Sequence, residues 1–302
     1  MTGSRGTAVA VALLAALAAA GCGLGPGAGV GSVDLTVTRE YGAVPVLHRS
    51  LEAKESDTVM RLLEGSAEVQ TRYGGGYVHS IDGVAEEERG GDPYDWFFYV
   101  DGTESPVGAA DASAQGGERI WWDFRDWAAT DHVPAVVGSW PAPFVSGVRG
   151  RRYPVVVECF GGGGACAAAR GRLEDEGVAL ASGSPKGAIH VLVGPWGRMR
   201  DQAAAQLIEE GPAESGVYAD FTAGGELVAL DEGGAEARRL GRGAGLIAAT
   251  SRYGGPPIWL ITGGTGAAVR EAAESLDAQH LRDHYAVAID AGKETPLPVA
   301  GR

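Results

Sequence analysis

The stretch DPYDWFFYVDG, residues 92–102, sets five aromatic rings in six consecutive positions and ends in an Asp-Gly pair. Side chains of a β-strand point alternately to its two faces. The rings therefore divide between the faces of one predicted strand, with Trp96 and Phe98 on one side and Phe97 and Tyr99 on the other. Asp-Gly is a frequent turn pair, so the strand is expected to end at this pair.

A second stretch, GERIWWDFR at residues 117–125, continues the pattern. Trp122 and Phe124 share one face of the predicted strand, and Trp121 lies on the other. Nine of the chain's 22 aromatic residues fall between residues 94 and 127. One ring-bearing face is enough for the core of a small domain, so the second face allows two interpretations. It packs against a helix or another domain, or it forms an apolar surface for a ligand.

The segment before these strands predicts a small, mostly β domain. Apolar and polar residues alternate over residues 33–38, and residues 76–83 predict another strand that ends in a turn. Between them, Ser56-Asp57 is expected to cap a short helix that stops at Gly65. The apolar face of this helix consists of Val59, Leu62 and Leu63.

The order of four blocks in this half resembles the transcobalamin-like C-terminal domain: TVMRLL at 58–63, GYVHSIDGV at 76–84, WFFYVDG at 96–102 and GERIWWDF at 117–124. The resemblance covers about residues 33–127. It implies a small β-grasp-like fold, which occurs in bacterial surface lipoproteins and in vitamin B12 carriers, where it closes over the corrinoid. Binding of a flat or amphipathic ligand follows, with cobalamin or another corrinoid as the first candidate.

The surplus of rings and this resemblance together predict eight ligand-binding residues: Tyr77, Trp96, Phe97, Tyr99, Asp101, Gly102, Trp121 and Trp122. The rings are expected to act by stacking and apolar burial, and the Asp101-Gly102 turn to supply polar fixing points. In the family, asparagine is common where this chain has Asp82 and Asp101. The alternative function is an envelope interaction module that meets another protein through its aromatic face and has no small-molecule ligand.

Residues 1–21 have the pattern of a secretory signal peptide, with an early charge at Arg5, an apolar run and small residues before Cys22. The run is shorter than the roughly 20 residues that a membrane-spanning helix needs. Its end, AAGC, resembles the lipobox of bacterial lipoproteins, which predicts a lipid anchor on Cys22 at the extracytoplasmic face of the cell membrane. Residues 22–32 are then a Gly-rich tether. The alternative is a secreted protein with a cysteine that lies near its cleavage site by coincidence.

The remaining cysteines, Cys159 and Cys166, form an even pair in an oxidising compartment. This favours a disulfide over a reactive thiol or a metal pair. No nucleophile, metal-ligand set or cofactor motif stands out elsewhere, so no catalytic residue, metal, cofactor or enzymatic activity is predicted.

The formal net charge is −14, and most of it belongs to the first half, where residues 33–129 hold 19 acidic and 8 basic residues. Binding to phosphate backbones is driven by lysine and arginine. Nucleic acid is therefore excluded as an expected partner.

Residues 129–151 contain SWPAP and are expected to form a linker. Residues 152–302 follow another pattern, in which apolar runs precede glycine turns and alanine-rich stretches. Two such units align at a constant offset of 69, with Gly194 matching Gly263. The predicted fold class is α+β, with a small β-grasp-like β domain at 33–128 and a duplicated α/β domain of strand-helix-strand units.

These features together predict a bacterial cell-surface lipoprotein. It is expected to bind a small ligand, either capturing it between the two domains or presenting it to a membrane transporter.

Overall fold

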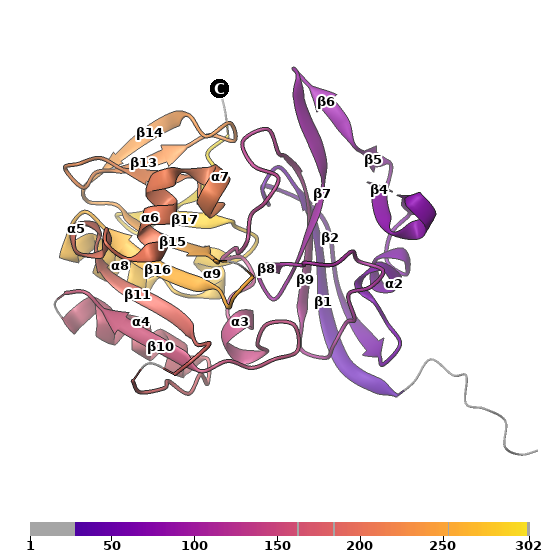
Figure 1. Cartoon of the computed structure of the whole chain (residues 1–302), viewed down its shortest axis with the longest axis horizontal. Helices are drawn as coiled ribbons and strands as arrows, with labels where there is room; N and C mark the ends of the chain where they lie inside the picture. The colour runs from indigo at the N-terminus through magenta and orange to yellow at the C-terminus, as the bar shows by residue number, and fades with distance from the viewer. Residues whose placement is uncertain (1–27, 162, 184, 253, 301–302) are drawn as a thin grey trace, which may run out of the picture.

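The computed structural model describes residues 28–300 except 162, 184 and 253. The predicted signal peptide, Cys22 and most of the tether lie outside the described residues. The fold is a mixed α+β fold, as predicted. Figure 1 shows a β domain in indigo to purple beside an α/β domain in pink to yellow.

The β domain is built on a mixed sheet with the strand order β2-β1-β9-β7-β6, in which β8 also pairs with β7. β1 runs parallel to β9, and the other neighbours are antiparallel. The strands are β1 (Gly29–Arg39), β2 (Val44–Lys54), β6 (Glu87–Arg89), β7 (Asp92–Val100), β8 (Thr103–Glu104) and β9 (Arg119–Asp126). The predicted tether, residues 22–32, ends earlier than expected. Its residues from Gly29 on belong to β1, because Gly29 pairs with Lys54 of β2.

One face of this sheet is covered by the helix α2 (Val59–Glu64) and by a small sheet of three strands. The small sheet contains β3 (Val69–Arg72), β4 (Tyr77–Ile81) and β5 (Val84–Ala85), with the short helix η2 (Tyr73–Gly75) between the first two. The cap of α2 is Thr58, whose hydroxyl accepts from the Arg61 backbone N–H at 3.3 Å. Asp57, part of the predicted cap, instead accepts from the Lys54 N–H at 2.9 Å.

The α/β domain has a six-stranded sheet with the order β10-β11-β16-β15-β17-β18. Its first three strands are parallel, and the others pair in antiparallel fashion. The strands are β10 (Val155–Cys159), β11 (Ile189–Pro195), β15 (Gly245–Thr250), β16 (Ile258–Gly263), β17 (Ala286–Asp290) and β18 (Lys293–Leu297). They are rich in valine, isoleucine and leucine because both faces of the sheet are buried.

One core lies under α4 (Gly163–Asp175) and α8 (Gly266–Glu274). The core of the opposite face contains α6 (Ala203–Glu210) and a three-stranded sheet, and it extends into the β domain. That sheet consists of β12 (Ala219–Phe221), β13 (Leu227–Leu230) and β14 (Glu236–Gly241). Short helices complete the domain: α5 (Trp196–Met199), α7 (Pro212–Ser215) and α9 (Ala278–Leu281).

The two predicted repeat units both contain a strand followed by helix, but their closing strands pair differently. The second unit is β16, α8 and β17, and β17 stays in the main sheet. The first unit contains β11, α5 and α6, and its closing strand β12 belongs to the three-stranded sheet. β12 belongs to that sheet because it pairs in antiparallel fashion with β13. The sequence spacing that the two units share does not predict this pairing.

The predicted linker, residues 129–151, is packed against both domains and carries the short helix α3 (Ala142–Val145). Val133 and Val136 belong to the core that the two domains share, and Trp140 is 1% exposed. Further along the chain, Cys159 and Cys166 form the predicted disulfide, with their Cα atoms 5.9 Å apart. No helix within the described residues is long and apolar enough to span a membrane.

Candidate functional site

The predicted aromatic residues divide between two faces, as the alternation of the strands required. Trp96 and Trp122 point into the core of the β domain and are 6% and 2% exposed. Tyr99 and Trp121 point the other way and are 0% and 2% exposed, because the α/β domain covers them. Phe97 is partly buried on that second face. The second face therefore packs against another domain.

We call this contact the aromatic interface. It consists of Tyr41, Phe97, Tyr99 and Trp121 from the β domain with Tyr218 and Tyr285 from the α/β domain. Tyr285 makes edge contacts with three rings of the β domain, at centroid distances of 5.0 to 5.6 Å. The Tyr41 and Tyr218 hydroxyls share a hydrogen bond of 3.0 Å. A ligand could reach the fully buried rings of Tyr99 and Tyr285 only if the two domains separated.

Two chains of hydrogen bonds in the aromatic interface end on Asp123. Tyr99 donates to Tyr285, which donates to Asp123 Oδ2 at 3.1 Å. Trp121 donates to Thr38 Oγ1, which donates to Asp123 Oδ1 at 2.6 Å. Burial raises the pKa of Asp123 to about 6, and these donors limit the rise. Asp123 thus joins both domains through one buried carboxyl group.

Arg125 brings a buried positive charge into the same interface. Its guanidinium lies 3.8 Å from the centroid of the Phe97 ring. It donates to the carbonyl oxygens of Asp126 and Thr130, at 3.0 and 2.9 Å, and to that of Asp131 at 3.3 Å. These bonds fix the chain where it leaves β9 and enters the segment 129–151.

The other predicted ligand residues lie at the ends of strands. The Tyr77 hydroxyl donates to Asp95 and to Glu86, and burial is the largest cause of its raised pKa. Asp101 and Gly102 form the two-residue turn between β7 and β8, with φ values of 50° and 74°. A Cβ on Gly102 would lie 2.8 Å from the Val136 carbonyl oxygen, so this turn also packs against the chain that follows β9.

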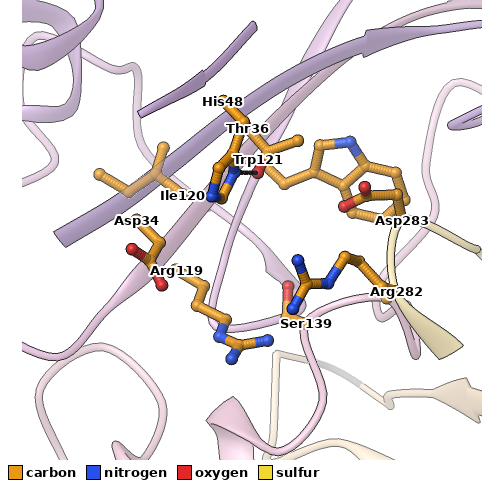
Figure 2. Close-up of a pocket in the computed structure, with 10 residues that line it drawn as sticks. Asp34, Thr36, His48, Arg119, Ile120, Trp121, Ser139, Arg282 and Asp283 are labelled. Atoms are coloured by element: carbon orange, nitrogen blue, oxygen red, sulfur yellow. Dashed lines mark hydrogen bonds between the residues drawn. The ribbon is translucent and has the colours of Figure 1, made fainter. Parts of the chain in front are cut away.

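A small pocket opens beside the aromatic interface, and we call it the charged pocket. It has a volume of about 70 Å³. The β domain contributes Asp34, Thr36, His48, Arg119, Ile120 and Trp121, and the rest of the chain contributes Gly138, Ser139, Arg282 and Asp283. In Figure 2 the guanidinium groups of Arg119 and Arg282 extend toward the same space, next to Ser139. Trp121 is thus a predicted ligand residue that does line a pocket.

Two glycines let the domains approach closely here. Gly42, with φ of 88°, lies against the Asp283 carbonyl oxygen, which a Cβ would approach to 1.8 Å. A Cβ on Gly138 would lie 2.7 Å from the His284 backbone nitrogen and 2.9 Å from the Trp121 ring. Larger side chains at either position would push the two walls of the charged pocket apart.

A longer opening, the β8 groove, consists of two adjoining pockets of about 350 and 440 Å³. Both are lined by Thr103, Ser105, Pro106 and Arg149. The first extends over Val100, Val107 and Glu118 of the β domain. The second reaches Ser251 and Gly255 of the α/β domain and also holds Glu104 and His132. The groove therefore begins at Val100 and Thr103, which flank the Asp101-Gly102 turn, and crosses from one domain to the other.

The sequence did not identify Asp34, Ser139, Arg282 or Asp283 as site residues. They belong to four distant segments that only the tertiary fold brings together. The one local signal was the charged run HLRDH at residues 280–284, where two histidines have the spacing of zinc ligands on a helix. The helix α9 ends at Leu281, so the run leaves the helix and its Arg282 and Asp283 enter the pocket.

One family model matches the part of the chain that carries the two aromatic strands. No curated protein matches the sequence. The α/β domain lies outside the family match, which starts just before α2 and ends with the last residue of β9. Residues 56–126 are similar to the family described as Domain of unknown function (DUF4430).

Proposed function

We propose that the chain is an extracytoplasmic lipoprotein that binds a small ligand in the β8 groove and presents it to a membrane transporter. The observation that carries the proposal is the groove itself, which both domains line. Its two pockets fall within the roughly 300–1,000 Å³ range of small-molecule sites. The AAGC sequence at Cys22 supports the lipid anchor.

The polar lining of the groove suits a ligand that offers both donors and acceptors. Glu104, which is paired with His132, and Glu118 supply acceptors, and burial raises the pKa of both carboxyl groups. Arg149 and His132 add donors, while Val100 and Val107 add apolar wall. Amphipathic ligands with peripheral amide groups, such as corrinoids, match this lining. The resemblance to transcobalamin-like domains makes cobalamin the first ligand to test.

The rival hypothesis is a module that meets another envelope protein through its aromatic face. That function needs a free aromatic face. In the structure the α/β domain covers Tyr99 and Trp121. For this reason we place ligand binding first.

Blocking the groove should weaken ligand binding. Val107 lines the groove and is 48% exposed, so a Val107→Trp substitution can place its indole in the first pocket without disturbing the core. We expect saturable binding of cobalamin to the full chain in detergent, and about a tenfold or greater loss of affinity in the variant. Equilibrium dialysis, read by the absorbance of the corrinoid, measures both.

The matched control is Val46→Trp, since Val46 is also an exposed valine, at 38%, and lies on β2 away from the groove. This variant should bind like the wild type. Equal losses in the two variants would place the ligand outside the groove. Absence of saturable binding in the wild type would rule out cobalamin as the ligand.

A further inference from the structure

The charged pocket holds four charged side chains of two signs. Arg119 and Arg282 are cationic, and Asp34 and Asp283 are anionic. Among the residues that the structure describes, none of the four forms an ion pair within 4.0 Å. Opposite charges that share a small pocket usually pair, and this separation leaves all four available to a ligand.

The position of Arg119 is fixed by a bond outside the pocket. Its guanidinium donates to the Trp140 carbonyl oxygen, and its backbone N–H donates to Asp101 Oδ1 at 2.9 Å. The side chain of Arg282 has no hydrogen-bond partner within the described part of the chain. With the hydroxyl of Ser139 beside them, the two guanidinium groups offer a binding place for a carboxylate (Figure 2).

The carboxylates lie toward the other walls of the same space. The backbone of Asp283 is left-handed, with φ of 59°, a conformation that costs energy and is often retained at functional sites. Burial raises the pKa of Asp283, while the attraction of Arg282, His284, His48 and Arg119 opposes the rise. His48 Nδ1 is bonded to Thr36 Oγ1 at 3.1 Å, which fixes the ring in the pocket wall. Asp34 and Asp283 lie on opposite sides of the pocket in Figure 2, so an ammonium group meets an acidic side chain on either side.

These charges select the class of ligand. The two guanidinium groups and the two carboxylates balance, although the chain as a whole has a net charge of −14. A simple anion would meet both carboxylates, and a simple cation would meet both guanidinium groups. A molecule that carries both signs can satisfy all four. At about 70 Å³ the pocket is several times larger than one water needs but smaller than the site of a drug-sized ligand.

We propose that the charged pocket binds a small zwitterion with one carboxylate and one ammonium group, the chemistry of a free α-amino acid. The carboxylate lies between Arg119, Arg282 and Ser139. The ammonium group faces Asp34, and Asp283 on the opposite side keeps the charge of the pocket balanced. The apolar walls of Ile120 and Trp121 leave room for a short aliphatic side chain. This site is separate from the β8 groove and does not depend on corrinoid binding.

Titration of the full chain in detergent with glycine and with L-alanine, followed by calorimetry, tests the proposal. Acetate and methylammonium serve as comparators because each carries only one of the two charges. We expect saturable binding of the amino acids, with each comparator weaker by about tenfold or more. Lack of saturation with both amino acids would overturn the proposal. Acetate that binds as tightly as glycine would also overturn it, and would indicate a simple anion site.

Two variants locate the site, and a third controls for charge. Arg282→Gln and Asp34→Asn should each weaken glycine binding by about tenfold or more. Arg49→Gln removes an exposed arginine of β2 whose neighbour His48 lines the pocket, so its side chain points to the opposite face of the strand. This control should leave the affinity unchanged. An equal loss in Arg49→Gln, or no loss in the two pocket variants, would contradict the site.

Discussion

Replacing Asp123 with alanine is expected to lower the free energy of unfolding by about 2–4 kcal/mol at pH 7. The carboxyl group accepts hydrogen bonds from Thr38, from the Gly42 backbone and from Tyr285. Alanine would leave these three donors without this acceptor, and the position of Asp123 itself is fully closed to solvent. Urea unfolding, followed by tryptophan fluorescence, measures the loss.

The same experiment tests whether the two domains unfold together. Tyr285 belongs to the α/β domain and Thr38 to the β domain, so Asp123 links both. The fluorescence transition, which reports on both domains, should remain single in the wild type and shift as a whole in the variant. Asp175→Ala is the control, because Asp175 is an exposed aspartate at the end of α4. A loss below about 0.5 kcal/mol in Asp123→Ala would show that the buried network contributes no more than a surface residue does.

The strands of the β domain could be predicted because their side chains alternate so clearly. Trp96 and Trp122 entered one core, Tyr99 and Trp121 entered another, and the turn fell at Asp101-Gly102. Alternation assigns each residue to a face. It does not say what covers that face, since this depends on how a distant part of the chain packs.

The candidate sites were hidden from the sequence for the same reason. Asp34 and Arg282 are separated by most of the chain and meet only because Gly42 and Gly138 allow the domains to come close. Neither glycine belongs to a recognisable motif. The glycine turns that the sequence predicts after the apolar runs lie where a strand leads into a helix, β11 into α5 and β16 into α8. Close approach between domains is a property of the tertiary fold, so local spacing cannot reveal it.

Asp101 couples the stability of the β domain to pH. Its Oδ1 accepts from the Arg119 N–H, while its Oδ2 is buried and has no partner among the described residues. Burial raises the pKa of this carboxyl from 3.8 to about 8, with a smaller rise from Glu118 and an opposing pull from Arg119. The folded protein therefore keeps a proton that the unfolded chain loses above about pH 4. Because the folded state binds more protons, its stability falls as the pH rises from about 4 to 8.

The Asp101→Asn variant should remove this fall, since its neutral amide resembles the protonated acid. Asparagine also tolerates the left-handed backbone of the turn. At pH 5 the variant should be about as stable as the wild type. Between pH 5 and pH 8 the variant should gain about 2–4 kcal/mol relative to the wild type, measured as urea stability. Asp82→Asn is the matched control, because Asp82 begins a similar Asp-Gly turn with φ of 48° but is exposed to solvent. Its difference from the wild type should stay constant over the same range. If the gain of Asp101→Asn is also constant with pH, the buried carboxyl is ionised in the folded protein and the turn alone explains the gain.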